Sequence, residues 1–332
     1  MSKLDVISVG DVVTDAFIRL FDDKAHVYAN EHGDWLAMPY ATKVPFEQSE
    51  VIEAVGNAAN AAVSFARLGL NSAFMTNVGE DKYGRDIIKQ LQKNKVDTRF
   101  VRVNPDKISN YHYVLWYKED RTILIEHEEY DYYWPHLHPK EIPSWLYFSS
   151  IAKNSLDYLD DLADWLEKHD EVKLALQPGT FQIEFGAKRL HRLYKRTEVL
   201  LLNREEAVQV GGGDHKDVND LIDHLHALGP KVVVVTDGHD GAYASDGTNR
   251  FKMPLYPDAK PPFERTGAGD AFSSTFVAEI IKGNSIEGAL QYAPINSMNV
   301  VQYVGARKGL LSHNELEELL KKAPEWYKPS RF

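Results

Sequence analysis

The sequence predicts an α/β protein in which a mostly parallel central sheet is covered by helices on both faces and a small β-sheet lid stands apart. Short apolar runs alternate with segments of helical periodicity along most of the chain, which is typical of parallel strands joined by helices. Residues 232–235 are all valine, as expected of a central strand that is buried on both faces. Two stretches, 25–49 and 109–127, break the alternation and favour antiparallel strands outside the main sheet.

The positions of apolar residues and glycines give the expected elements in order. Residues 5–10 are expected to form a buried strand that ends in glycine. Residues 56–69 are expected to form a helix, because their alanines favour close packing and Gly69 is a natural stop. A strand at 72–78 and a helix at 83–93 follow. Further strands are expected at 145–149, 173–177, 199–202 and 232–236, and helices at 156–169, 187–194 and 218–228.

The lid is expected mainly from the segment 109–127, which alternates like a hairpin. Every second residue from Tyr111 to Tyr117 is tyrosine or leucine, and a polar turn lies near 119–120. An ordinary extension of the main sheet at its edge is the alternative for these strands. The expected division of the chain is one domain over 1–322, with lid strands inserted at about 12–50 and 107–130, and a loose tail at 323–332.

Composition and charge exclude several classes of protein and site. The chain has 332 residues, of which 43 % are hydrophobic and 26 % charged, as is ordinary for a globular protein. The net charge of −11 argues against nucleic acid as a partner. The absence of cysteine excludes disulfides and thiolate metal sites. We find no signal-peptide pattern and no apolar run near the ~20 residues that span a bilayer, so we expect a cytoplasmic protein without a membrane partner.

The stretch 266–272, Thr-Gly-Ala-Gly-Asp-Ala-Phe, is the most informative part of the chain. Gly267, Ala268 and Gly269 precede a helix-like segment, so their backbone N–H groups and the positive end of the helix dipole would surround an anion. Asp270 follows them, and a carboxylate there can take the proton of a hydroxyl that attacks phosphorus. The pattern predicts phosphoryl transfer, with Asp270 as general base and the three amides as an anion hole. A glycine turn with an aspartate helix cap is the alternative.

Two further polar groups follow expected parallel strands, whose carboxyl ends bind ligands in open α/β sheets. Asn203 and Glu206 can hold a hydrated Mg²⁺, or they can form a helix N-cap. Thr236, Gly238 and Gly241 suit nucleotide phosphates, or a plain turn. The chain contains no Gly-x-x-x-x-Gly-Lys-Ser/Thr, which excludes a P-loop NTPase. It also lacks a Gly-x-Gly-x-x-Gly after the first strand, which argues against dinucleotide binding.

Two residues near the start of the chain suit a sugar. Asp15 and Asn60 can bond to sugar hydroxyls, whereas a solvated loop aspartate and a helix asparagine are the alternatives. Several histidines lie near acids, but their spacing does not fit a metal site, so we expect them at the surface. These histidines are His112, His127, His136 and His138.

Together these motifs resemble the PfkB family of carbohydrate kinases, also called the ribokinase-like family. The segments 56–69 and 265–272 are similar to its first and second signatures. The order of the motifs also fits the family, and the likeness runs from about residue 5 to residue 320. The resemblance implies a ribokinase-like α/β domain with a β-lid, and transfer of the ATP γ-phosphate to a hydroxymethyl group.

The resemblance also implies roles for individual residues. Asp270 would be the base, and the amides of 267–269 would form the anion hole. The cofactors would be ATP and Mg²⁺, with K⁺ as a further candidate, and the lid would join two subunits. Substrate binding would fall to Asp15, Gly56 and Asn60. Nucleotide contacts would come from Asn203, Thr236, Gly238, Gly241 and Gly305, and metal contacts from Glu206 and Asn203 through water, with Glu264 at a monovalent-cation site.

Three departures from the family pattern concern the site. Val55 stands where a first glycine is usual, so the substrate loop can differ. Glu264 and Arg265 replace the usual Asp-Thr, which puts the cation site in question. Arg265 either binds an anionic substrate group or pairs with Glu264. The segment 177–179, Gln-Pro-Gly, occupies a region where many related sugar kinases carry a motif with Asp or Asn.

Three functions fit these motifs. The leading one is an ATP-dependent kinase of a small sugar, similar to a ribokinase or fructokinase. A phosphosugar is the less favoured acceptor, because no cluster of Lys and Arg marks a second phosphate site. Another function, from a different class, is a non-catalytic regulator that binds a sugar or nucleotide. The departures from the family pattern at Val55, Glu264 and Arg265 favour it, and the retained Asp270 argues against it.

The remaining function, and the runner-up to the sugar kinase, is an adenosine-like nucleoside kinase. Aromatic residues between 111 and 134 can stack on a base, or they can fill a lid or dimer core. They are Tyr111, Tyr113, Trp116, Tyr130, Tyr132, Tyr133 and Trp134.

Overall fold

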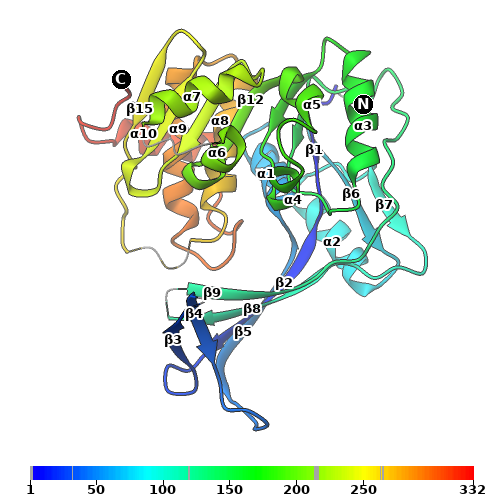
Figure 1. Ribbon diagram of the computed structural model, residues 1–332, viewed down its shortest axis with the longest axis vertical. Helices are drawn as coiled ribbons and strands as arrows, with labels where there is room; N and C mark the ends of the chain where they lie inside the picture. Colours follow the sequence, from blue (N-terminus) through cyan, green and yellow to red (C-terminus); the bar gives the residue numbers. More distant parts are fainter. Residues whose placement is uncertain (1–2, 32, 119, 213–216, 262, 264) are drawn as a thin grey trace.

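A computed structural model describes residues 3–31, 33–118, 120–212, 217–261, 263 and 265–332 (Figure 1). Within these residues the main sheet has ten strands in the order β16-β15-β14-β13-β12-β11-β10-β1-β6-β7. The strands from β13 to β7 run parallel, and β14, β15 and β16 add antiparallel strands at one edge. The bounds are β1 (Val6–Val9), β6 (Ser72–Gly79), β7 (Val101–Asn104), β10 (Trp145–Phe148), β11 (Lys173–Leu176), β12 (Thr197–Asn203), β13 (Val232–Thr236), β14 (Ala242–Ser245), β15 (Arg250–Met253) and β16 (Ser330–Arg331).

Helices connect most of the parallel strands, as the alternation predicted. They begin and end as follows in the described residues: α1 (Asn57–Arg67), α2 (Lys82–Lys93), α3 (Leu156–Glu167), α4 (Thr180–Phe185), α5 (His191–Arg196), α6 (Arg204–Gly211), α7 (Val218–Ala227), α8 (Ala268–Ile281), α9 (Ile286–Val300) and α10 (His313–Lys321), with a 3-10 turn at Gly238–Asp240.

The main sheet is buried on both faces, and the valine run of β13 shows how. Val233 and Val235 lie in the core beneath α3, α5, α6 and α7. Val234 points to the opposite face and lies in the core beneath α1, α8, α9 and α10. Because successive strand residues point to opposite faces, only a strand covered on both sides is apolar throughout. The prediction of a central, doubly covered strand at 232–236 is confirmed.

A second sheet stands apart from the body as a lid (Figure 1). Its strand order is β5-β2-β8-β9, and β2 pairs antiparallel with β5 and parallel with β8. A two-stranded hairpin, β3 with β4, lies beside it. The pairing separates these strands from the main sheet, so the alternative of an edge extension is wrong. The lid strands are β2 (Val13–Leu20), β3 (His26–Asn30), β4 (Gly33–Ala37), β5 (Phe46–Val55), β8 (Tyr111–Tyr117) and β9 (Asp120–Glu126).

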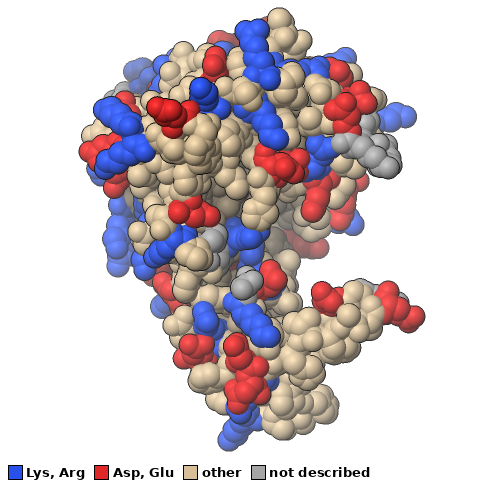
Figure 2. Space-filling view, turned by 90° about the vertical axis from the view of Figure 1, so that its left-hand side faces the viewer, with Lys and Arg blue, Asp and Glu red and all other residues tan. Residues whose placement is uncertain are grey.

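The two faces of the lid differ in what they contact. One face is turned toward the body and presents Asp15 and Arg121 to the cleft described below. The other face carries a cross-strand row of Val51, Tyr113 and Leu124, which are 50 %, 48 % and 52 % exposed. The lid forms the lower part of the molecule in Figure 2. The inner part of this face packs on α2 through Tyr111 and Tyr83, whose rings are 4.8 Å apart, and the row further out is an exposed apolar surface.

The C-terminal segment corrects one expectation. Residues 323–332 were expected as a loose tail, but β16 pairs with β15 and so extends the main sheet. Tyr327 is only 5 % exposed and packs edge-on against Tyr256 at 4.9 Å. The segment is held because its aromatic ring is buried and its backbone finds a strand edge, neither of which local composition reveals. Among the described helices, none has the length and apolarity to cross a membrane.

Candidate active site

A cleft of about 450 Å³ lies between the carboxyl ends of the parallel strands and the lid. The ends of β12 and β13 supply its back, the start of α8 its side, and β2, β8 and β9 its lid wall. This is the edge at which open α/β sheets bind ligands. The predicted residues that line it are Asp15, Gly56, Asn60, Asn203, Glu206, Thr236, Gly267, Gly269, Asp270 and Gly305.

The turn before α8 requires glycine at its first position. Gly267 has φ 79°, in the left-handed region that side chains rarely adopt. A Cβ atom there would lie 2.3 Å from the Cβ of Ala306, so the turn packs directly on the following loop. Ala268 N–H donates to the Arg265 carbonyl at 3.4 Å, whereas the amides of Gly267 and Gly269 make no hydrogen bond to a described residue. Two of the three predicted amides are therefore available to an anion.

Asp270 lies in the first turn of α8 and is held by two amide side chains. Asn60 Nδ2 donates to its Oδ2 at 2.8 Å, and Gln177 Nε2 donates to its Oδ1 at 3.2 Å. Burial raises the pKa of Asp270 above the ordinary aspartate value, and the two hydrogen bonds oppose this shift. The carboxylate faces the cleft without a cationic partner among the described residues. It is thus a carboxylate held in a fixed position, with an elevated proton affinity.

Gln177 is a site residue that the motif analysis did not identify. Its Oε1 accepts a hydrogen bond from the Tyr147 hydroxyl, and this bond orients its amide so that Nε2 points at Asp270. It follows the strand β11, at the same edge as the other site residues. The position had been noted only as a departure from the family pattern, whereas the structure gives it a contact with the predicted base.

Asn203 and Glu206 satisfy both interpretations that the sequence allowed. Asn203 Oδ1 accepts from Glu206 N–H at 2.8 Å, and Glu206 Oε2 accepts from Asn203 N–H at 2.9 Å, which is a capping box at the start of α6. Both also line the cleft. Burial raises the pKa of Glu206, and the charge of Asp270 adds to the shift. Two carboxylates thus repel each other at one cleft, which is a setting that a divalent cation relieves.

A second cavity of about 230 Å³ adjoins the cleft on the far side of α8. Thr236, Arg265 and Gly269 line both cavities, so a ligand can extend from one into the other. Gly241 has φ 90° and a Cβ there would lie 2.1 Å from the Met253 carbonyl oxygen, so the turn is confined to glycine. The remaining walls are largely apolar and include Ala242, Pro254, Leu255, Tyr256, Phe272, Pro294, Met298 and Val301.

The nucleotide residues predicted from sequence divide between the two cavities. Gly238 and Gly241 line the second cavity, Thr236 lines both, and Gly305 lines only the cleft. Ala268 also faces the second cavity rather than the cleft. Glu264 lies outside the described residues, so the predicted cation site is not placed.

The lid wall of the cleft carries an aspartate next to a histidine near its inner end. Asp15 Oδ1 lies 3.3 Å from His112 Nδ1, and His112 Nε2 lies 2.9 Å from His127 Nε2, with the two rings stacked. The side chain of His112 is 13 % exposed. The expectation of a surface histidine is therefore wrong for His112, because a strand pairing across the lid, Asp15 with His112, brings it into the cleft. Spacing in the sequence does not reveal this pairing.

The loop that leads from the lid into α1 combines two unusual backbone conformations. Ala54 has φ 61° and Gly56 has φ 115°, while Val55 between them pairs with Val13 of the lid. A Cβ at Gly56 would lie 2.9 Å from the Asp11 carbonyl oxygen. The departure at Val55 is accommodated because the positive φ angles fall on its neighbours.

The aromatic residues that suggested a nucleoside acceptor do not line the cleft. Tyr113 faces outward on the lid, and Trp116 packs edge-on against Phe263 at 5.1 Å. Tyr132 donates its hydroxyl to Asp11 at 2.8 Å and packs against Tyr158 of α3. Burial raises the pKa of Asp11 to about 6, although Tyr132 and the Ala152 amide oppose the shift. Trp116 and Tyr130 are buried, as the alternative of a lid core expects, whereas Tyr113 and Tyr133 are 48 % and 53 % exposed.

Comparisons with known proteins agree with this geometry. The model of the pfkB family carbohydrate kinase matches residues 22–313. The ATP-dependent 6-phosphofructokinase of Thermoanaerobacterium thermosaccharolyticum is 25 % identical over 333 residues, covering 92 % of this chain and 90 % of that protein.

Two solved structures share the fold over nearly their whole length. The nucleoside kinase of Methanocaldococcus jannaschii has a TM-score of 0.78 and 16 % identity, covering 97 % of this chain and 100 % of its own. The Arabidopsis thaliana ribokinase complexed with ribose and ATP has a TM-score of 0.76 and 20 % identity, covering 97 % and 99 %. With a matching family model over most of its length, a ribokinase-like fold and an aspartate poised at a helix start, the chain belongs to the pfkB family of carbohydrate kinases.

Proposed function

We propose that the protein transfers the γ-phosphate of ATP to a hydroxymethyl group of a small sugar, with Asp270 as the general base. The observation that carries this proposal is the position of Asp270, which lines the cleft from the first turn of α8 and directly follows Gly269, a residue that lines both cavities. One cavity is polar and lies under the lid, and the other is largely apolar. Such a pair suits an acceptor and a nucleotide that meet at the base.

The chain's own groups would divide the work as follows. Asp270 accepts the proton of the attacking hydroxyl, while the amides of Gly267 and Gly269 donate to the charge that develops on the transferred group. Asp15, Gly56 and Asn60 are the proposed substrate residues. Thr236, Gly238, Gly241, Gly305 and Asn203 are the proposed nucleotide residues. Ala268, the third predicted member of the anion hole, lines the second cavity and donates its N–H to the Arg265 carbonyl, so we assign the anion hole to the other two amides.

Mg²⁺ fits the acidic side of the cleft. Glu206 would hold the hydrated ion through water, together with Asn203, since Mg²⁺ in proteins keeps several waters. When bound, it would neutralise charge on the nucleotide phosphates. K⁺ remains a proposed activator whose predicted ligand, Glu264, lies outside the described residues, and comparing rates in K⁺ and in choline would test it.

We favour a sugar over a nucleoside because the lid wall of the cleft offers the polar side chains of Asp15 and His112 and a single phenyl ring, Phe17, among the described residues. A base would need a flat apolar surface, and the seven candidate aromatics lie elsewhere. A non-catalytic regulator is the remaining alternative, and its prediction is binding without turnover.

The decisive experiment is an Asp270→Asn substitution measured by ADP release. Asparagine keeps the shape and can keep only one of the two accepted hydrogen bonds, and it cannot take a proton, so kcat should fall by roughly two orders of magnitude or more. ATP affinity, measured by calorimetry, should stay within about threefold. Near-normal kcat in this variant would remove Asp270 from the mechanism.

The lid is also the proposed site of dimerisation. We propose that the row of Val51, Tyr113 and Leu124 meets the same row of a second subunit, because apolar strand residues of this exposure are ordinarily covered. On this proposal residues 1–322 act as one catalytic unit, with the lid strands at about 12–50 and 107–130 inserted in it.

A further inference from the structure

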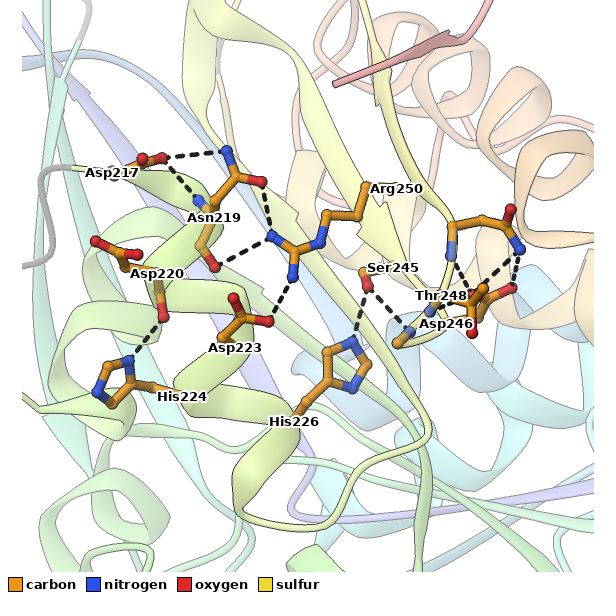
Figure 3. Close-up of polar contacts among 12 residues, drawn as sticks. Asp217, Asn219, Asp220, Asp223, His224, His226, Ser245, Asp246, Thr248 and Arg250 are labelled. Atoms are coloured by element: carbon orange, nitrogen blue, oxygen red, sulfur yellow. Dashed lines mark hydrogen bonds and ion pairs between the residues drawn. The ribbon is translucent and has the colours of Figure 1, made fainter.

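Almost every arginine of the described chain has a polar partner for its side chain. Figure 3 shows a typical case, in which Arg250 lies between Asn219 and Asp223. Among the described arginines, only Arg85, Arg121 and Arg265 make no hydrogen bond or ion pair with a described residue through their side chains. Two of these three, Arg121 and Arg265, line the cleft.

Arg121 occupies a defined place on the lid wall. It pairs across the strands with Trp116, whose ring is covered by Arg19 at 4.4 Å. Arg19, Trp116 and Arg121 form one row across the lid strands. Arg19 forms an ion pair with Glu47 at 2.8 Å, so Arg121 is the cation of this row that can bind a ligand. Trp116 also contacts Phe263 in the loop before the anion hole, which fixes the row against the body at the mouth of the cleft.

The charges of the cleft are sorted by position. Asp15 and His112 form a pair near the inner end. Asp270 is held close to this end, because it accepts a hydrogen bond from Asn60 in α1, the helix that follows the lid strand β5. Trp116 lies four residues beyond His112 along β8, which places the row of Arg121 about 13 Å further out. An anionic group at the inner end would meet the carboxylates of Asp15 and Asp270, whereas at the outer end it would meet the guanidinium of Arg121, which has no side-chain partner among the described residues. The sorting therefore suits a substrate with a hydroxyl at one end and a negative charge at the other.

Arg265 has a different position, because it lines both cavities. A cation at that junction is placed for the phosphates of the nucleotide rather than for the far end of the acceptor. Arg121 lines only the cleft.

We propose that the acceptor is an anionic sugar whose phosphate or carboxylate binds Arg121 while its free hydroxymethyl group faces Asp270. This inference rests on the proposed function and names the substrate class of that same site. In the reaction the hydroxyl oxygen bonds to the γ-phosphorus, the bond from that phosphorus to the β–γ bridging oxygen breaks, ADP leaves, and the hydroxyl proton passes to Asp270. The second anionic group of the sugar is unchanged, and its bidentate contact with a guanidinium supplies binding and orientation.

The sequence alone had argued against such a substrate, since it shows no local cluster of basic residues. The two arginines are 144 positions apart, and the fold brings them to one cleft. The inference therefore depends on the strand pairing of β8 with β9 and not on a motif.

The test compares three matched acceptors by ADP release: a neutral aldose, the same sugar with a phosphate opposite its free hydroxymethyl group, and the corresponding sugar acid. We expect kcat/KM for one of the two charged acceptors to exceed that for the neutral sugar by tenfold or more, and the better of the two identifies the anion. Equal or higher kcat/KM for the neutral sugar would overturn the inference.

An Arg121→Gln variant tests the residue. In Arg121→Gln the ratio of kcat/KM for the anionic acceptor to kcat/KM for the neutral sugar should fall about tenfold, because KM for the anionic acceptor rises. In Arg121→Lys the ratio should lie between those of the wild type and Arg121→Gln, because lysine keeps the charge but lacks the planar guanidinium. Binding of the anionic sugar to the nucleotide-free protein, measured by calorimetry, should weaken by a similar factor. Arg85→Gln, on the exposed face of α2, is the matched control and should leave the ratio unchanged.

Other outcomes separate this inference from the function on which it rests. If Arg121→Gln weakens the anionic and neutral acceptors equally, or raises KM for ATP instead, Arg121 does not bind the acceptor's anion. If neutral sugars are phosphorylated with full dependence on Asp270, the kinase proposal stands and the anionic inference fails. If no acceptor of any charge releases ADP, the proposed function itself fails.

Discussion

The carboxyl group of Asp270 combines two properties that oppose each other in a folded protein. It must be ionised to act as a base, yet burial favours its protonated form and raises its pKa. Asn60 and Gln177 reduce this conflict because both donate hydrogen bonds to the ionised form. Catalytic groups commonly have such a tuned proton affinity.

The raised pKa predicts how Asp270→Asn affects stability. A carboxyl group whose pKa is higher in the folded than in the unfolded protein stabilises the fold below its unfolded pKa, and this contribution is lost as the pH rises through the folded value. At pH 7 the wild type therefore bears the cost of a buried charge that the variant lacks. We expect the thermal midpoint of Asp270→Asn to equal or exceed that of the wild type at pH 7, and the difference to shrink towards pH 4. A variant that is clearly less stable at pH 7 would contradict this.

Gln177 gives a second prediction for a single residue. Gln177→Leu removes one donor to the carboxylate, so the pKa of Asp270 should rise further and the acidic limb of kcat/KM should move to higher pH. Activity at pH 7 should fall about tenfold and recover partly at pH 8.5. A pH profile measured by ADP release checks this, and an unshifted limb would mean that the contact has no effect on the base.

Single residues were predicted unevenly from the sequence. Asp270 and the glycines before it were accessible because a turn, an acid and a helix start are adjacent in the chain. Gln177, His112 and Arg121 were not, because each reaches the cleft through strand pairing between distant segments. The position of the seven aromatics was not predictable for a related reason. Alternation shows which residues share one face of a strand, but it does not show which face of the lid is turned to the cleft.

At the scale of elements, the turn before α8 depends on its contact with the loop after α9. Gly267→Ala would place a Cβ 2.3 Å from that of Ala306 at a positive φ, and we expect a loss of roughly 1–3 kcal/mol in unfolding free energy together with lower activity. Gly269→Ala is the matched control, because a Cβ there meets no atom within 4 Å. It should leave stability within about 0.5 kcal/mol while reducing activity, since its methyl group narrows the cleft. Chemical denaturation measures the unfolding free energy of both variants. Equal destabilisation by Gly267→Ala and Gly269→Ala would show that the close approach of Gly267 to Ala306 does not matter for stability.

The elements themselves were largely predictable, but the sheet edges were not. The six parallel strands that were predicted lie within two residues of their expected positions, because short apolar runs mark them well. The parallel strand β7 was not predicted. The short strand β16 and the buried Tyr327 escaped detection, since two residues of strand carry no periodicity. Pairing partners, unlike strand positions, are properties of the folded chain.

At the scale of the whole molecule, the exposed row on the lid predicts the oligomeric state. If the lid joins two subunits, Tyr113→Lys should convert a dimer into a monomer, because it places a charge in an apolar interface. Light scattering after size exclusion measures the mass directly. Val103→Lys, on the edge strand β7 and 44 % exposed, is the matched control and should remain dimeric. A wild-type monomer at all concentrations would contradict the proposal.

The net charge of the chain describes its extended surfaces, and it does not describe a single small ligand site. Basic and acidic side chains are interspersed on the face shown in Figure 2, and no broad basic surface crosses it among the described residues. The net charge of −11 nevertheless left room for Arg121 and Arg265 at the cleft, which have no side-chain partner in the described part of the chain. Total charge reports on extended surfaces, while a ligand site depends on a few local groups.

The direct passage from β1 into β2 has a mechanical consequence. Asp11 sits at this junction and is anchored on three sides, by Tyr132, by the Ala152 amide and through its own N–H by the Ser150 carbonyl. The eight residues of β2 extend from that fixed point as a lever arm of about 26 Å. A rotation of only ten degrees at the fulcrum would sweep the far end of the arm through about 5 Å. A force on the far end of β2, from a ligand or a neighbouring subunit, would therefore act on the three hydrogen bonds that hold Asp11.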